Sequence, residues 1–403
     1  MRLRPTVDSG LILLGLAALA VGQPHQLIGD GYERYAQLST VLGEHRLPGG
    51  DYSLVGPLFA TPFWLLDAVA YFNATVIAAG LGVTWLLLRR RVDGDLLRAF
   101  LLLVVAGSMV AVAAADFYGE AFTAMAVGAG LLAVALGHRL AGWVAVVVGA
   151  VNTPASLVGL GLVSGVETVR ARRLRYLVPF AAGVALVLTE IVLRHGGYVG
   201  NRGSRTVMPY SGEPGFSYPF LLGVAALLFS FGRGLVFFLP GLVLPARQRL
   251  RARSPELEHV YLLWTVFLAG LVVAYASWWA WHGGQAWGPR FLLVGVLPAS
   301  LALAVRLRDP GSRPLADLAT LAVLALSMWI GAASTAFNQL WPPQCGGDTE
   351  FLCHFTPEFS PLWYPFVARP DLDVRQWLTL GYHAVVLVWL AVPVISRIGT
   401  SSR

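Results

Sequence analysis

Four carboxylic acids stand close together in the segment that follows the first apolar run of the chain. They are Asp30, Glu33, Glu44 and Asp51, within GDGYERYAQLSTVLGEHRLPGGDYSLVGPLFATPFWLLD. Carboxylates held beside a bilayer can act as bases, as metal ligands or as groups that bind sugars. A simple channel or anchor has little use for such a segment, so it predicts chemistry at the membrane surface.

Asp30 and Glu33 are the candidate catalytic acids of this segment. They also fit a structural role, because Asp is a good helix N-cap and a Glu three residues later completes a capping box. The two roles are compatible, since a cap also fixes a side chain in place. Asp51 and Tyr52 follow in the same loop as candidate substrate-binding residues.

A second pair of acids, Asp116 and Glu120, lies in the sequence DFYGE between two apolar runs. Residues four apart share one face of a helix, so both acids are expected on one face at the membrane boundary. A plain interfacial anchor would more often use Trp, Tyr or Arg. We therefore treat both acids as candidate substrate-binding residues, with an anchor as the alternative.

The segment WWAWHGGQAWGPRF, residues 278–291, combines aromatic residues with His282 and Arg290. The Trp residues could form only an aromatic belt. A belt does not explain the Gly-Gly bend or the two basic residues, which suit a phosphate oxyanion. Arg233, inside an apolar run, also indicates an anionic partner. The sequence therefore predicts donor phosphate binding by His282, Arg290 and Arg233.

Four further residues are candidates for substrate binding. Trp281 and Gln285 lie in the segment 278–291. Arg202 and Arg205 lie in the Gly-rich stretch 194–218, which is a candidate lid or acceptor surface. Cys345 and Cys353, in CGGDTEFLC, are expected to form a disulfide if that loop lies outside the cell.

The composition is that of an integral membrane protein, with 56% hydrophobic and 13% charged residues. The chain has no Lys, which excludes Schiff-base chemistry and leaves Arg or His to hold a phosphate. The net charge of +7 does not predict nucleic-acid binding, because the Arg residues lie in short clusters between apolar runs, where they meet lipid headgroups.

The apolar runs predict an all-α polytopic membrane protein, a single membrane domain over residues 1–403 with about twelve transmembrane helices. A hairpin broken at Asn152-Thr153-Pro154 and a short interfacial helix over 56–66 are also expected. The predicted spans are 9–27, 67–88, 98–115, 120–137, 140–151, 155–169, 176–193, 222–245, 259–277, 289–306, 315–335 and 376–395.

Arg is concentrated in alternate connections, which the positive-inside rule makes cytoplasmic together with both termini. The remaining connections are longer and hold most of the acidic and aromatic residues. The predicted outer loops are 28–66, 194–221, 278–290 and 336–375. Chemistry is therefore expected on the periplasmic or extracellular face of the cell membrane.

Taken together, these motifs resemble the integral-membrane C-type (GT-C) glycosyltransferases. The shared features are an acid in the first outer loop (GDGYERYA), an interfacial helix (GPLFATPFWLL), a second acid site (DFYGE) and a Pro-broken helix pair (VNTPASL). The resemblance departs at the first acids, since relatives often carry adjacent acids before Arg-Tyr-Ala, whereas Gly31 and Tyr32 separate Asp30 from Glu33.

The resemblance implies a polyprenyl-phosphate sugar as donor and Asp30 as the base of an inverting transfer, with Glu33 in reserve. The acceptor would be a glycan, a glycolipid or a protein, and the lipid bilayer the other partner. The residues identify no cofactor with certainty, and a divalent cation stays open as an alternative. The Lys-free, Ala/Val/Arg-rich usage is typical of GC-rich bacteria and favours mannose or arabinose as the sugar.

Two other classes of protein stay open. A twelve-span transporter or flippase of a lipid-linked or small polar substrate would place ionisable residues at mid-membrane and tend to have two similar halves. Here the acids lie at the outer edge and the halves do not match. A non-catalytic envelope assembly protein is the third class, and it should tolerate Asp30→Asn.

The Arg distribution predicts which connections an impermeant thiol reagent reaches. In a cysteine-free background, Glu44→Cys should be labelled in intact cells, whereas Val92→Cys should be labelled only after the membrane is opened. Labelling of position 92 but not of position 44 in intact cells would reverse the predicted orientation.

Overall fold

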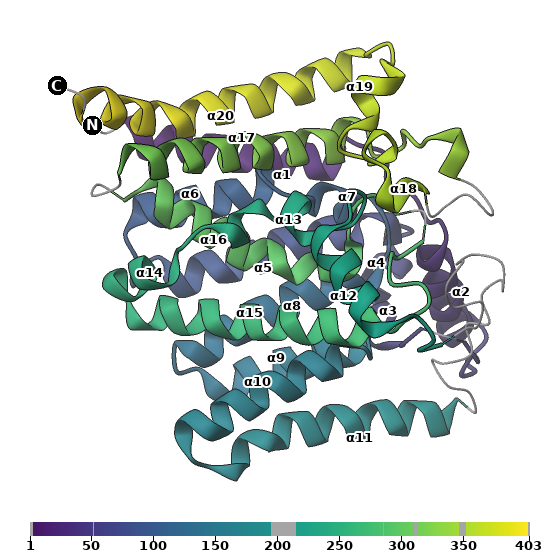
Figure 1. Cartoon of the computed structure of the whole chain (residues 1–403). Coiled ribbons are helices and arrows are strands. Elements are labelled where there is room, and N and C mark those ends of the chain that lie inside the picture. The colour runs from purple at the N-terminus through teal and green to yellow at the C-terminus, as the bar shows by residue number, and fades with distance from the viewer. Residues whose placement is uncertain are drawn as a thin grey trace.

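The computed structural model describes residues 3–50, 52–194, 215–284, 286–309, 313–345 and 352–401. Within these ranges the chain is helical and has no strand, only an isolated parallel bridge between Gln26 and Asp116. Most helices run roughly parallel to one another in a stack (Figure 1). The chain is thus a polytopic helical membrane protein, as the apolar runs predict.

Short helices and 3-10 turns (η) alternate with the long helices along the chain. In chain order the elements are α1 Leu3–Val21, α2 Asp30–Gly43, α3 Val55–Phe59, α4 Thr61–Leu65, η1 Val69–Tyr71, α5 Phe72–Leu88, α6 Gly94–Ala106, α7 Val110–Ala115, α8 Gly119–Ala135, α9 Arg139–Asn152, α10 Ser156–Ala171, η2 Leu174–Leu177, α11 Val178–Leu193, α12 Phe220–Phe229, α13 Leu235–Phe238, η3 Pro240–Val243, α14 Arg247–Arg253, α15 Pro255–Ala276, η4 Arg290–Gly295, α16 Val296–Leu307, α17 Pro314–Ala336, η5 Pro343–Cys345, α18 Leu352–Phe355, η7 Pro357–Phe359, α19 Tyr364–Ala368 and α20 Val374–Ser401.

Seven helical segments of the described chain are long and apolar enough to cross a membrane, by length and composition alone, against about twelve spans predicted. The predicted spans 98–115 and 222–245 are each broken into shorter helices, and 120–137 forms only the 17-residue α8. The seven segments are Arg4–Val21, Val69–Leu88, Leu174–Leu193, Pro255–Ala276, Arg290–Leu307, Pro314–Ala336 and Val374–Ile398.

The hairpin predicted around Asn152-Thr153-Pro154 is confirmed. Helix α9 ends at Asn152, Thr153 is extended, and α10 begins at Ser156. The predicted interfacial helix over 56–66 is two short helices, α3 and α4, which meet at Ala60. Both features lie near α2, so the breaks in the helices position the first loop.

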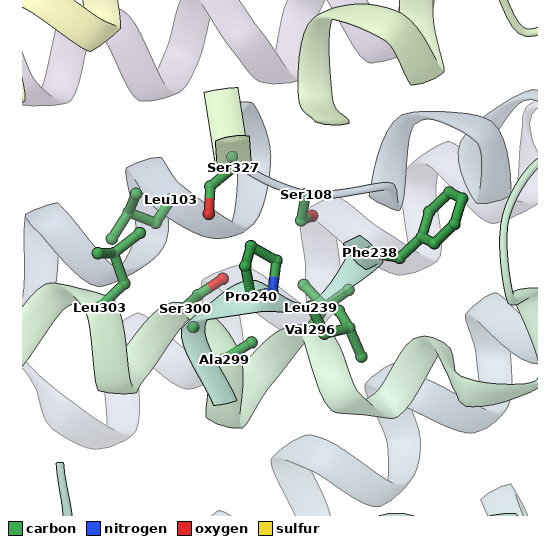
Figure 2. A pocket seen from close by; sticks show the side chains of 12 residues that line it. Leu103, Ser108, Phe238, Leu239, Pro240, Val296, Ala299, Ser300, Leu303 and Ser327 are labelled. Atoms are coloured by element: carbon green, nitrogen blue, oxygen red, sulfur yellow. The ribbon is translucent and has the colours of Figure 1, made fainter. Parts of the chain in front are cut away.

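The break between α6 and α7 lies beside a small cavity in the middle of the bundle (Figure 2). Ser108 compensates the broken helix: its hydroxyl donates to the Val104 carbonyl at 2.6 Å and accepts from the Val110 amide at 3.2 Å. Pro240 and Ser300 line the same cavity from η3 and α16. Irregular backbone at this depth is thus enclosed by protein.

The two ends of the bundle differ in what they carry. The N- and C-termini lie together at one end, with the Arg-rich α14, and α2, α3, α18 and α19 lie at the other (Figure 1). The described helices of the predicted outer segments 28–66 and 336–375 therefore lie at the end opposite the termini.

Helices α8 and α9 approach so closely that their backbones touch. A Cβ added at Gly142 would lie 2.7 Å from the Gly130 carbonyl oxygen, and one at Gly130 would lie 2.8 Å from the Gly142 carbonyl oxygen. Small residues permit such an approach between helices in a bilayer.

Gly142→Ala should therefore push the two helices apart and lower the free energy of unfolding by about 1–3 kcal/mol, the usual cost of overpacking. Thermal or detergent unfolding of the purified protein measures this. Gly82→Ala in α5 is the matched control, because a Cβ there meets nothing within 4 Å. Equal stability of the two variants would show that the contact is not tight.

Candidate functional site

The side chain of Asp30 contacts two residues from other segments of the chain. The N-cap of α2 is Gly29, with a positive φ of 49°, and it makes no side-chain capping bond. The interpretation of Asp30 as the N-cap is therefore wrong, because Asp30 is already the first helical residue. Its Oδ1 accepts from the Tyr52 hydroxyl at 2.7 Å, and its Oδ2 accepts from Arg290 Nη2 at 2.5 Å.

Arg290 is the centre of the site, and its side chain is only 13% exposed. Its Nε lies 3.7 Å from Glu120 Oε1, and its guanidinium lies 4.6 Å from the centre of the Tyr118 ring. Nε has no hydrogen-bond acceptor within the described part of the chain. A small cavity next to it is lined by Tyr118, Glu120, Trp287 and Arg290. Nε is thus paired with Glu120 by charge, without a hydrogen bond.

Asp116 and Glu120 do not share a helix face, contrary to the prediction from their spacing. Asp116 is extended at the end of α7, and α8 begins only at Gly119. The amide of Asn73 holds the intervening turn by donating to the carbonyls of Asp116 at 2.5 Å and Tyr118 at 2.8 Å. Both acids still face the site, because Arg290 interacts electrostatically with each of them.

Two further residues of the site, Arg34 and Asn152, are not among those predicted from the sequence. Arg34 lies one turn after Asp30 and is 6% exposed. Its Nη1 donates to Asn152 Oδ1 at 3.4 Å, and its guanidinium lies 5.1 Å from the centre of the Tyr52 ring. The spacing of four from Asp30 on an amphipathic helix could have found Arg34.

Asn152 connects three segments that lie far apart in the sequence. Its Nδ2 donates to the Gly119 carbonyl at 2.8 Å, and its Oδ1 accepts from the Gly56 amide at 2.9 Å. Its place at the end of α9 was visible in the sequence only as a helix break. Asn152 thus fixes α3 and the start of α8 around Arg34.

The two aspartates of the site, Asp30 and Asp116, have opposite pKa shifts. Burial alone would raise the pKa of Asp30, but the charge of Arg290 and the hydrogen bond from Tyr52 outweigh it, so the pKa lies below the usual range. Burial raises the pKa of Asp116 to about 6, with only partial opposition from Arg290. Asp30 is therefore ionised at neutral pH, whereas Asp116 titrates close to it.

The other residues predicted to bind the donor phosphate form a neighbouring buried cluster. Arg233 is 1% exposed, and it donates to the carbonyls of His282 at 2.7 Å and Gly284 at 2.9 Å. The His282 ring lies 4.5 Å from that of His354, and Trp281 packs against both. Arg233 thus holds the Gly-Gly bend that precedes Arg290.

Glu33 lies outside the site. Its side chain is exposed on α2, and it has no hydrogen bond or ion pair with the described residues. Asp51, Arg202, Arg205 and Gln285 lie outside the described residues.

Only one cysteine of the predicted disulfide has a described side chain. Cys345 is fully buried and disulfide-bonded. The side chain of Cys353, the other cysteine of the sequence, lies outside the described part of the structure, so the pairing stays a prediction.

The described residues contain no group of three or more His, Cys, Asp or Glu side chains that could hold a metal ion. Comparison with known proteins adds no assignment: no family model, curated protein or solved structure matches the chain.

The raised pKa of Asp116 predicts a pH dependence of stability. Because the folded state binds the proton more tightly than the unfolded chain, the free energy of unfolding should fall as pH rises from about 4 to about 6. The loss should be on the order of 2–3 kcal/mol, since one pKa unit is worth about 1.4 kcal/mol.

Asp116→Asn should remove this fall and be more stable than the wild type at pH 7. Thermal unfolding of the purified protein between pH 4 and pH 7.5 measures the difference. Glu33→Gln, an exposed acid, is the control and should follow the wild type. Parallel curves for the wild type and Asp116→Asn would contradict the raised pKa.

Proposed function

We propose that this protein is a sugar transferase of the cell envelope. It takes mannose or arabinose from a polyprenyl-phosphate donor and transfers the sugar to a glycan, glycolipid or protein at the periplasmic or extracellular face. The observation that supports this proposal best is the contact between Asp30 and Arg290, which are 260 residues apart in the chain and 2.5 Å apart in space.

The proposed reaction is a single displacement with inversion. The acceptor hydroxyl oxygen forms a bond to the anomeric carbon, the bond from that carbon to the phosphate oxygen breaks, and the hydroxyl proton passes to a carboxylate. The reaction needs one base, plus a cation that stabilises the charge gained by the departing phosphate. Asp30 is suited to the first role and Arg290 to the second.

Before the donor binds, Asp30 and Arg290 are paired with each other. A donor phosphate that takes Arg290 removes the cation that lowers the pKa of Asp30, so the carboxylate becomes a stronger base as the donor binds. Glu120, 3.7 Å from Arg290 Nε, remains as a second carboxylate partner of Arg290. Base activation is in this way coupled to donor binding.

Asp116 is the rival for the role of base, because its pKa of about 6 is closer to the operating pH of a general base. Asp30 has the advantage of position: it contacts the cation that would hold the leaving group. Substitution of each acid separates the two assignments.

The experiment is a transfer assay in membranes with a panel of radiolabelled polyprenyl-phosphate sugars. Asp30→Asn should lower turnover about a hundredfold or more, the contribution expected of a general base, while donor binding persists. Glu33→Gln should change turnover little, because Glu33 is exposed and away from the site. A larger loss in Asp116→Asn than in Asp30→Asn would transfer the role of base to Asp116.

The role of Arg290 is tested by binding of a polyprenyl phosphate to the purified variants. Arg290→Ala should weaken donor binding and slow turnover together. Arg290→Lys should restore only part of both, because Lys keeps the charge but lacks the planar guanidinium that donates two parallel hydrogen bonds to a phosphate. Arg170→Ala, an exposed Arg of α10, is the control. Unchanged binding by Arg290→Ala would remove Arg290 from the donor site. No transfer by the wild type from any donor, together with substrate uptake, would overturn the proposal in favour of a transporter.

A further inference from the structure

A buried ion pair lies at the end of α11, and no step of the proposed reaction uses it. Glu190 stands in the last turn of the helix and Arg194 is its C-cap, with Arg194 Nη1 2.8 Å from Glu190 Oε1. The two side chains are only 14% and 3% exposed. Taking two charges out of water is costly unless further hydrogen bonds compensate the pair. Both side chains make such bonds to the segment 48–54, which precedes α3.

Arg194 binds the backbone of this segment at two places. The described residues of 48–54 belong to no helix or strand, so their carbonyl and amide groups need partners from elsewhere. Arg194 Nε donates to the Pro48 carbonyl at 2.9 Å, and its Nη1 donates to the Tyr52 carbonyl at 2.6 Å. The planar guanidinium thus fixes two points of the segment relative to each other, which the point charge of an ammonium group does not do.

Glu190 binds the two residues that follow Tyr52. Its Oε2 accepts from the Ser53 hydroxyl at 2.9 Å, and its Oε1 accepts from the Leu54 amide at 2.7 Å. Ser53 is fully buried, so its hydroxyl depends on a partner within the protein. The backbone on both sides of the Tyr52 ring is therefore held against α11.

The side chain of Tyr52 extends from this fixed backbone to the candidate site. Its hydroxyl donates to Asp30 Oδ1 at 2.7 Å, and the centre of its ring lies 5.1 Å from the Arg34 guanidinium. A Tyr side chain is a rigid ring with only two χ angles, so the position of the hydroxyl follows the position of the backbone. Helix α11 is thus connected to Asp30 through a single residue.

The simplest role for the ion pair is to anchor the loop, and that role explains the bonds to Pro48 and Leu54. It makes no use of what the Tyr52 ring touches. Tyr52, however, is bonded to Arg194 by its carbonyl and to Asp30 by its hydroxyl. A displacement of the pair therefore moves the hydrogen bond that Asp30 receives.

We propose that Glu190 and Arg194 are positioning residues, which hold the Tyr52 hydroxyl on the Asp30 carboxylate. The role of Asp30 as base rests on the proposed function, whereas these contacts do not. A hydrogen bond to an ionised carboxyl group favours the ionised form. Against the effect of burial, the charge of Arg290 and the bond from Tyr52 hold the pKa of Asp30 below its usual range. Loss of the ion pair should therefore raise the pKa of Asp30.

The experiment is a pH titration of Asp30 in the purified full-length protein, followed by the infrared band of the protonated carboxyl group. Each protein is compared with the same protein carrying Asp30→Asn, which assigns the band. Tyr52→Phe should move the titration to higher pH, because Asp30 loses a hydrogen-bond donor. The double variant Glu190→Gln/Arg194→Met should move it in the same direction, although neither residue touches Asp30.

The double variant removes both charges together, because a single change would leave the other charge buried without a partner. Arg194→Lys should give a smaller shift, since Lys keeps the pair with Glu190 but does not hold both carbonyls. Adding Tyr52→Phe to the double variant should give no larger shift than Tyr52→Phe alone, because the pair acts through Tyr52. Thr189→Ala is the matched control and should follow the wild type, since the Thr189 hydroxyl is bonded to its own helix.

Two results would overturn the proposal. One is an Asp30 titration in the double variant that coincides with that of the wild type while Tyr52→Phe shifts it, which would make the pair a loop anchor only. The other is an unchanged titration in Tyr52→Phe. The titration needs no substrate, so a failure to transfer sugar would count against the proposed function and not against this connection. If the wild type transfers sugar, the acid limb of turnover against pH should shift upward in each variant together with the titration.

Discussion

The ion pair between Asp30 and Arg290 is the contact on which the arrangement of the site depends. Both side chains are largely removed from water, with exposures of 29% and 13%. Taking two charges out of water is costly unless each finds a partner, and removal of one partner leaves the other buried and uncompensated. The start of α2 and the start of η4 are therefore held to each other, and Glu120, Tyr118 and Tyr52 are further partners of the pair.

The backbone around this pair is irregular, and side-chain amides and one guanidinium compensate it. Asn73 holds the turn after α7, Asn152 holds α3 against the start of α8, and Arg233 holds the bend before Arg290. Each donates to carbonyls in turns or at the start of a helix, where backbone enclosed by protein needs polar partners. The positions of the charged groups thus follow from these polar contacts as much as from the helices.

The environments of Asp30 and Asp116 push their pKa values apart. Asp30 contacts a cation and a hydroxyl, which keep it ionised, whereas burial of Asp116 brings its pKa to about 6. Two carboxyl groups separated in this way are typical of sites that move protons. The Asp30 pKa is set by Arg290, so any anion that competes for this guanidinium changes the basicity of Asp30 as well.

The sequence by itself determined the helical membrane architecture, the hairpin broken before Pro154 and the choice of Asp30, Glu120 and Arg290 as candidate residues, because apolar runs, Pro and costly charges are local properties. It placed Asp30 as a helix cap and put Asp116 and Glu120 on one helix face, and it missed Arg34 and Asn152. Those points depend on which segments meet in space. Only the tertiary structure decided them, since a buried charge takes the partner that packing brings to it, and that partner can lie 260 residues away.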